Sequence, residues 1–198
     1  MAFSPNVSGV TSCGVPGIRP VIYGSHLCHF YPDRDELVQS LVPFFQAGLL
    51  NNERCLWVTA EPLPAAQARA ELAKTTPDLE VRIANGQLRI VDGCEWYESS
   101  RGMTANDLIA RWLKEETDAL NAGYRGLRIT GNTSFLTPDA WDAFMEYEAL
   151  VSKAFEGRRI VALCSYHFSE CQPSDVLNVI RLHHHTLVKS ANGWQVLE

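Results

Sequence analysis

The sequence predicts an α/β domain, a three-layer sandwich in which helices cover both faces of a mostly parallel central sheet. Three observations support this fold class. Apolar strand-like segments and amphipathic helix-like segments alternate about five times. The strand-like segment Cys55–Thr59 has so little polarity that burial on both faces is expected, and Arg159–Tyr166 is strongly apolar. Several helix-like segments begin with helix-capping residues. Regular alternation of this kind is typical of a parallel sheet whose strands are joined by helices.

The regular pattern begins at Gly24. Ser25–Tyr31 alternates like a strand, and a helix is predicted after Pro32. Asp33 is a preferred helix N-cap residue, and Glu36 lies at the spacing of a capping box. The remaining strands are predicted at Cys55–Thr59, Leu88–Val91, Gly126–Thr130 and Arg159–Tyr166.

The later helices carry their own start signals. Thr104 and Asp107 are suited to cap one helix, and Pro138 falls in the first turn of another, where proline is tolerated. The Asn192-Gly193 pair favours a tight turn near the end of the chain. The predicted helices after the first are Pro64–Lys74, Thr104–Asn121, Pro138–Phe155 and Pro173–His183, and the predicted terminal hairpin is Leu187–Val196.

Composition and charge favour one soluble, cytoplasmic domain. The chain has 198 residues, of which 46% are hydrophobic, and this suffices for one buried core. The net charge is −6 and no basic run occurs, so we expect no nucleic-acid partner. No apolar stretch is long enough for a membrane span, and no signal peptide is recognisable. We expect residues 1–20, rich in Ser, Gly and Pro, to form a flexible leader and residues 21–198 to form the domain.

The segment after the first strand lacks a phosphate-binding loop. Such a loop has the pattern GxxxxGK[ST], in which backbone N–H groups and a lysine bind the phosphates. Here the strand continues into Pro32-Asp33-Arg34-Asp35, which contains neither glycine nor lysine, and both aspartates would repel a polyphosphate. After the fourth strand, Asn132 stands where a metal-binding aspartate would be expected. We therefore expect no NTP hydrolysis, and the lack of GxGxxG argues against a dehydrogenase.

These residues resemble a known family. The run HLCHFYPDRDELVQSLVPFFQAGLLNNERCLWVTAEP resembles the start of the MEDS domain, the methanogen/methylotroph, DcmR sensory domain. The later segments GLRITGNTSFL, Tyr147-Glu148-Ala149 and ALCSY, followed by a helix ending in His, fit that family in the same order. The resemblance covers roughly Gly24 to Leu187.

The resemblance implies a degenerate RecA- or KaiC-like fold without a Walker A loop. It also implies a sensor of small molecules, with simple hydrocarbon derivatives as the expected ligand class. The sequence carries no recognisable kinase or helix-turn-helix output module. We therefore expect the domain to act through a protein partner, such as a kinase or regulator, or through a homo-oligomer.

The candidate ligand-binding residues follow from the predicted sheet. Ligands of such sheets bind at the carboxyl ends of the strands, and an apolar pocket with a few polar groups suits a small organic molecule. The competing interpretation is that the aromatic residues only fill the core and that Glu148 lies on a solvated helix face. The candidates are His26, Cys28, Phe30, Tyr31, Arg34, Glu61, Asn132, Glu148, Cys164, Tyr166 and His184.

A metal site is one alternative. His26 and Cys28 share one face of the first strand. If the first and fifth strands are adjacent, as a RecA-like topology implies, these two residues would meet Cys164 and His184. The resulting Cys₂His₂ set would suit zinc or another transition metal as cofactor. Against this, a buried cysteine is usually a core residue, and a histidine at a helix end commonly caps carbonyls.

Enzymatic activity is a weaker alternative. Cys28 or Cys164 with a histidine could form a nucleophile, but no third orienting residue or oxyanion loop accompanies the pair. We therefore expect a sensor that is not an enzyme. A metal-binding sensor and a non-catalytic scaffold stay open as alternatives, and residual ATP binding is the weakest of them.

Overall fold

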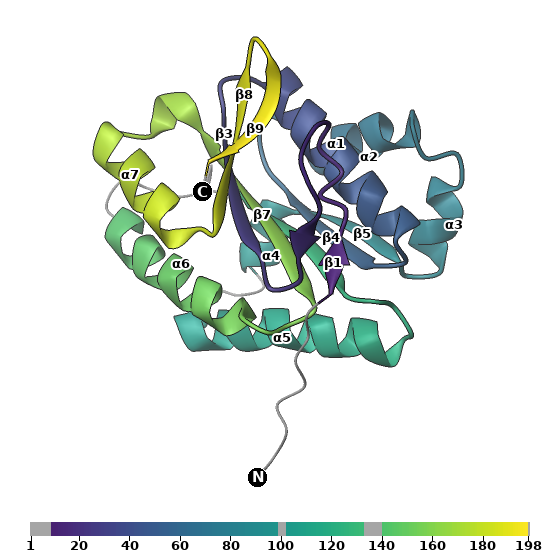
Figure 1. The fold of residues 1–198 in the computed structure, drawn as a ribbon. Coiled ribbons are helices and arrows are strands. Elements are labelled where there is room, and N and C mark those ends of the chain that lie inside the picture. Colours follow the sequence, from purple (N-terminus) through teal and green to yellow (C-terminus); the bar gives the residue numbers. More distant parts are fainter. Residues whose placement is uncertain (1–8, 99–101, 133–139, 198) are drawn as a thin grey trace.

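The computed structural model describes residues 9–98, 102–132 and 140–197. Its centre is a seven-stranded sheet with the strand order β5-β4-β6-β7-β3-β8-β9 (Figure 1). All five predicted strands and the predicted terminal hairpin are present. The strands of this sheet are β3 (His26–Tyr31), β4 (Arg54–Thr59), β5 (Leu88–Asp92), β6 (Leu127–Asn132), β7 (Ile160–His167), β8 (His185–Ser190) and β9 (Gly193–Leu197).

The pairing within the sheet is parallel from β5 through β8, and β9 joins β8 in antiparallel orientation. The mostly parallel sheet is therefore confirmed. The first and fifth predicted strands, β3 and β7, are neighbours, with Cys28 opposite Cys164 and His26 opposite Ala162. This register sets the spacing of the side chains from which the candidate site is built.

Helices cover both faces of the sheet, so the predicted three-layer sandwich is confirmed (Figure 1). The first three helices pack on one face, where Trp57 and Leu163 belong to their core cluster. The other helices pack on the opposite face around Ile129, Ala162 and Cys164. The helices are α1 (Arg34–Leu50), α2 (Ala65–Ala73), α3 (Leu79–Ala84), α4 (Gly93–Glu98), α5 (Ala105–Asn121), α6 (Trp141–Phe155) and α7 (Pro173–Leu182), with a short 3₁₀ helix, η2, at Phe168–Glu170.

Strand β3 is buried along its whole length and supplies both cores. Because successive side chains of a strand point to opposite faces, Leu27 and Tyr31 pack on the α1 side. Cys28 and Phe30 pack on the side of α6 and α7. His26 precedes Cys28 by two residues and points to that second face as well, which decides where the candidate site lies.

The helix caps agree with the sequence. The Asp33 carboxylate accepts a hydrogen bond of 2.9 Å from the backbone N–H of Glu36, which caps α1. The Glu36 side chain does not complete the box, because its Oε1 lies 3.4 Å from His29 Nε2. Thr104 and Asp107 form a complete capping box at the start of α5. The α1 cap matters for function, since a carboxylate occupies the Glu36 N–H in the place where a phosphate loop would offer such groups to a ligand.

The segment before β3 corrects one expectation. Residues 9–20 belong to the expected flexible leader, yet they pack on the domain, where Cys13 and Val15 are buried in the core. Two short antiparallel strands, β1 (Val10–Thr11) and β2 (Val21–Ile22), close this segment. A composition rich in turn-forming residues predicts a non-repetitive backbone but does not show whether that backbone is packed. Residues 1–8 lie outside the described residues.

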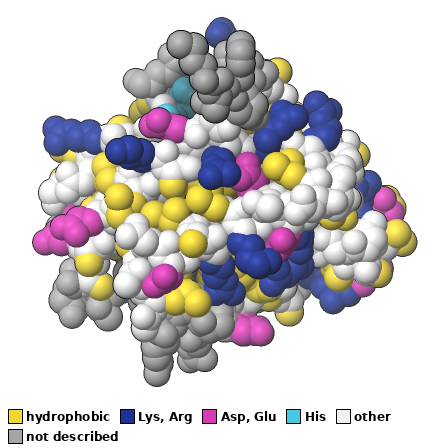
Figure 2. Space-filling model, turned by 90° about the horizontal axis from the view of Figure 1, so that it is seen from below, with side chains coloured by type: hydrophobic (Ala, Val, Ile, Leu, Met, Phe, Trp, Pro, Cys, Tyr) yellow, Lys and Arg dark blue, Asp and Glu magenta, His cyan; other side chains and the backbone are white. Residues whose placement is uncertain are grey.

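One face of the molecule carries mixed charge. Figure 2 shows acidic and basic side chains interspersed with apolar ones on the face viewed from the α5 side. Two charged residues of α5, Lys114 and Glu115, pair with Asp118 and Arg89. None of the described helices combines the length and the apolarity that crossing a membrane requires.

Candidate functional site

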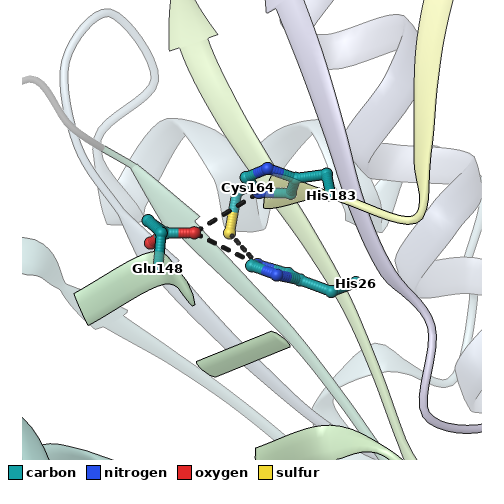
Figure 3. A group of neighbouring side chains, drawn as sticks. All are labelled: His26, Glu148, Cys164 and His183. Carbon is teal, nitrogen blue, oxygen red and sulfur yellow. Dashed lines mark hydrogen bonds and ion pairs between the residues drawn. The ribbon is translucent and has the colours of Figure 1, made fainter. Parts of the chain in front are cut away.

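Four buried side chains converge between the sheet and the helices α6 and α7 (Figure 3). They are His26 at the start of β3, Glu148 on α6, Cys164 in β7 and His183 directly after α7. One nitrogen, oxygen or sulfur atom from each residue lies within 4.8 Å of the corresponding atoms of the other three. We call this group the His–Glu–Cys–His cluster.

Two structural features bring these residues together. The β3–β7 register places His26 opposite Ala162, two residues before Cys164 on the same face of β7. Glu148 lies in the buried stripe of α6, between Met145 and Val151. These residues recur every three positions, so the apolar stripe that docks the helix also carries the carboxylate inward. Glu148 therefore faces the core, and the solvated position considered from the sequence is wrong.

The cluster distances are short. His26 Nε2 lies 3.2 Å from Cys164 Sγ and 3.3 Å from Glu148 Oε2. His183 Nε2 lies 3.3 Å from the same Glu148 oxygen. The rings of His26 and His183 are neighbours, with centroids 4.0 Å apart. Figure 3 shows both rings turned toward the Glu148 carboxylate.

Hydrogen bonds on the far side of each ring assign the tautomers. The Ser152 hydroxyl donates to the Leu182 carbonyl, so its oxygen is left to accept from His26 Nδ1–H at 2.7 Å. His183 Nδ1–H donates to the Val179 carbonyl at 2.7 Å. A neutral imidazole has one protonated nitrogen. Both rings therefore direct an unprotonated Nε2 into the cluster.

Burial disfavours the charged forms of His26 and Cys164. Desolvation, followed by the nearby His183 and His184, lowers the pKa of His26 well below its ordinary value. Desolvation, followed by the Glu148 carboxyl, raises the pKa of Cys164 well above its ordinary value. A neutral imidazole and a protonated thiol are thus the favoured states of these two groups.

Two atoms of the cluster have no hydrogen bond among the described residues. Glu148 Oε2 and His183 Nε2 are both buried and lack a hydrogen-bond partner, although they lie 3.3 Å apart. With His183 in the neutral Nδ1–H form and Glu148 as a carboxylate, both atoms are acceptors, so no hydrogen bond joins them. Lone pairs that meet without a shared hydrogen leave the centre of the cluster electron-rich.

A small cavity of about 30 Å³ adjoins the cluster. Its wall contains His26, Glu148 and Cys164, and it also contains aromatic side chains and Gly131. A cavity of this size exceeds the roughly 10–15 Å³ that one water molecule needs. The aromatic residues of the wall are Trp112, Phe144, Tyr147 and Phe155. A mostly apolar chamber therefore ends on a set of polar groups.

The structure brings together only part of the predicted metal set. His26 and Cys164 are in the cluster. Cys28 shares their face of the sheet, but its Sγ lies 3.2 Å from Thr186 Oγ1. His184 is exposed, and its Nδ1 accepts a hydrogen bond of 2.9 Å from the backbone N–H of His26. Glu148 and His183 stand where Cys28 and His184 were expected.

The other predicted ligand residues lie elsewhere. Phe30 and Tyr166 pack against each other, with ring centroids 5.5 Å apart. Tyr31 lies on the opposite face of the sheet. Arg34 pairs with Glu71 at 2.9 Å. Glu61 is exposed, and Asn132 is a residue of β6 whose side chain lies outside the described part of the structure. The cluster thus lies on a sheet face, under helices, and not at the strand ends where we expected the ligand.

The sequence analysis did not predict His183 and Ser152 as residues of the site. His183 was part of the run His183-His184-His185, but the helix was expected to include it, and α7 ends at Leu182. The extended backbone of His183 directs its ring inward and the next residue outward. Ser152 gave no signal, because a serine in a helix has many ordinary roles.

The fold and the cluster define a class of protein: a RecA-like α/β domain with an acidic helix cap in place of a phosphate loop. Comparison with solved structures supports the fold. A KaiC-like protein from the hyperthermophilic archaeon Pyrococcus horikoshii superposes with a TM-score of 0.58 at 12% identity. The match covers 96% of this chain and 86% of that protein.

The chain belongs to the MEDS family, the methanogen/methylotroph, DcmR sensory domain, whose family model matches residues 25–184. The matched range encloses all four cluster residues. Membership of a family of sensory domains supports a sensory role in general. A search of curated proteins finds no match.

Proposed function

We propose that this domain detects a small, largely apolar molecule, which binds in the cavity beside the His–Glu–Cys–His cluster. One observation carries the proposal: aromatic side chains enclose a small chamber that ends on buried polar groups. Binding sites for small organic molecules combine an apolar wall with a few convergent polar groups in this way. The family's sensory character agrees with this proposal.

Binding without turnover fits the chemistry of the site. A nucleophilic cysteine needs a lowered pKa, whereas burial raises the pKa of Cys164. At the end of β3, the Asp33 carboxylate caps α1 where an NTPase would bind phosphate. We therefore propose a sensor that is neither a thiol enzyme nor an NTPase.

Helix α6 would transmit ligand binding from the cavity to the protein surface. Tyr147, Glu148 and Val151 of this helix line the chamber, while Glu146 and Leu150 on its outer side are exposed. A ligand that prefers one position of α6 shifts the population toward that position. A protein partner or a second copy of the chain that contacts the outer side of α6 would then respond.

A ligand screen tests the proposal. Small alcohols, halocarbons and amines are titrated against the full chain, and the expected hit raises the melting temperature by mass action. Gly131→Ala is the matched variant: its Cβ would lie 3.5 Å from Cys164 Sγ, an ordinary contact, so it narrows the cavity without a clash. Ala149→Ser, on the exposed side of α6, is the control.

The expected result is a hit that Gly131→Ala weakens at least tenfold and Ala149→Ser leaves unchanged. A titration with labelled ATP and Mg²⁺ runs in parallel, and no saturable binding is expected. The proposal is wrong if no compound shifts the melting temperature, or if hits bind both variants equally. A stable kinase or regulator complex without any ligand effect would favour the scaffold instead.

A further inference from the structure

We propose that His26, Glu148, Cys164 and His183 form a binding site for one divalent transition-metal ion, with Zn²⁺ as the preferred ion. The donor set consists of two imidazole nitrogens, one carboxylate oxygen and one cysteine sulfur, whose thiol proton would be released to solvent when the metal binds. Zinc in proteins is bound by these donor types, usually four at a time. The inference goes beyond the proposed sensing of an organic molecule and does not depend on it.

The geometry of the cluster matches a tetrahedral ion. With metal–ligand distances of about 2.0–2.3 Å, tetrahedral donors lie about 3.3–3.8 Å from one another. The separations His26 Nε2–Cys164 Sγ, His26 Nε2–Glu148 Oε2 and His183 Nε2–Glu148 Oε2 are 3.2, 3.3 and 3.3 Å. All the other pairs lie within 4.8 Å. Small shifts of these side chains would complete the coordination.

The unpartnered acceptors supply an independent observation. The side chains of Glu148 and His183 are 4% and 0% exposed. Neither Glu148 Oε2 nor His183 Nε2 has a hydrogen bond among the described residues. Burying a polar atom without a partner costs several kcal/mol in an apolar medium. A proton on either atom would let the two hydrogen-bond to each other, whereas a cation at the centre would satisfy both atoms and also contact the donor atoms of His26 and Cys164.

Hydrogen bonds to neighbouring groups orient the two histidine rings in the way that is usual for metal ligands. Metal-binding histidines usually donate their second N–H to an oxygen, which fixes the ring and the tautomer. His26 does so to Ser152 Oγ and His183 to the Val179 carbonyl, each at 2.7 Å. Two core histidines without a shared role would not need to direct their Nε2 atoms at the same point.

The test uses the untagged full chain, purified without chelator and analysed for metals. We expect about one zinc ion per chain. Reconstitution with Co²⁺ should give tetrahedral d–d bands and a thiolate-to-cobalt charge-transfer band. Cys164→Ser should abolish the charge-transfer band, and His183→Ala should lower metal affinity at least tenfold.

The chain offers matched controls for both variants. Cys28→Ser removes a buried thiol directly opposite Cys164 that bonds to Thr186, and His184→Ala removes the exposed neighbour of His183. Both controls should retain the metal and the cobalt spectrum. If Cys164→Ser does not fold, Glu148→Gln replaces it with loss of metal affinity as the readout, and circular dichroism verifies the fold.

Two results would overturn the inference. The first is folded wild-type protein without stoichiometric metal and without a cobalt spectrum. The second is loss of metal in the control variants to the same extent as in the cluster variants. Metal content is measured without any organic ligand, so a failed ligand screen and a failed metal analysis are separate outcomes.

Discussion

At the scale of single residues, Arg128 is the most heavily bonded side chain of the described structure. It is fully buried, and all five of its guanidinium N–H groups find acceptors. The closest is the Glu53 carboxylate, 2.6 Å from Nε. The other acceptors are Phe44 O, Cys13 O, Ser12 O and Thr11 Oγ1. Arg128 therefore connects α1, the turn before β4 and the segment before β3.

Glu53 depends on this contact for its charge. Burial alone would raise the pKa of Glu53, but the Arg128 charge and hydrogen bonds from Arg128, Thr11 and Asn51 lower it below its ordinary value. The folded-state pKa is thus depressed, so this contribution to stability is complete above the unfolded-state pKa. It is lost as the pH falls through the folded-state value.

We predict that Arg128→Met lowers the free energy of unfolding by about 3–5 kcal/mol, because it leaves the Glu53 carboxylate buried without its partner. Urea unfolding at pH 7 measures the change. Arg125→Met is the control, since Arg125 is exposed and donates to Asn51 on the surface. Its cost should stay below about 1 kcal/mol. Equal costs for the two variants would contradict the prediction.

His29 gives the fold a second pH dependence. Burial, followed by the Lys189 charge, lowers the pKa of His29 to about 3, and Glu36 is the acidic group that faces it, at 3.4 Å. Folded His29 stays neutral, while the unfolded chain binds a proton below its ordinary pKa of about 6.5. Stability is therefore complete above pH 6.5 and decreases as the pH falls toward 3.

We predict that the free energy of unfolding decreases between pH 6.5 and pH 4.5 less steeply in His29→Gln than in the wild type. One neutral buried histidine contributes up to about 1.4 kcal/mol per pH unit in this window. Urea midpoints at several pH values measure both slopes, and the difference isolates His29 from other titrating groups. Identical slopes would show that His29 is protonated in the folded state.

At the scale of elements, periodic patterns predicted the sheet and its helices well. Apolar runs such as Arg159–Tyr166 became buried strands, and the caps at Asp33 and Thr104 start helices as expected. Such patterns are local, so the sequence displays them directly. The short α3, α4, β1 and β2 were missed, because a six-residue helix has fewer than two turns and a two-residue strand shows no alternation.

The candidate site was predictable only in part, for reasons that also operate at this scale. His26 and Cys164 followed from strand alternation and from the β3–β7 adjacency. His183 was missed through a one-residue difference in where α7 ends, and boundaries are the least certain part of a sequence-based prediction. Cys28 was on the right face, but its rotamer turns the sulfur toward Thr186, and no sequence pattern encodes that choice.

The N-terminal segment yields a prediction about glycine. Gly14 has φ = +88°, and a Cβ there would lie 2.1 Å from the Pro43 carbonyl oxygen of α1. Gly17 has φ = +80°, but its Cβ would meet only the Trp194 carbonyl oxygen, at 3.7 Å. Both glycines have a left-handed backbone conformation, but only Gly14 lacks space for a Cβ atom.

We therefore predict that Gly14→Ala destabilises the fold by more than Gly17→Ala, whose cost should be about 1–2 kcal/mol of backbone strain. Gly14→Ala should also make residues 9–20 more sensitive to limited proteolysis, because the segment must move away from α1. Melting temperatures and cleavage rates measure the two effects. Equal behaviour of the variants would mean that the segment is not held closely against α1.

At the scale of the whole molecule, a RecA-like sheet is combined with a site in an unusual place. Ligands of open α/β sheets normally lie beyond the carboxyl ends of the strands. Here the acidic cap of α1 occupies that region, while the polar cluster lies under α6 and α7. The sheet and its order belong to the fold, whereas function must be argued from the cluster and its cavity.

The cluster side chains come from both ends of the domain: His26 opens the first strand of the main sheet, and His183 precedes the last pair of strands. A bound ion would thus link two chain segments that are synthesised at different times. A nascent chain that has not extended past α7 lacks His183, so it would hold the ion less tightly than a longer chain. Removing the ion should loosen both ends of the domain together.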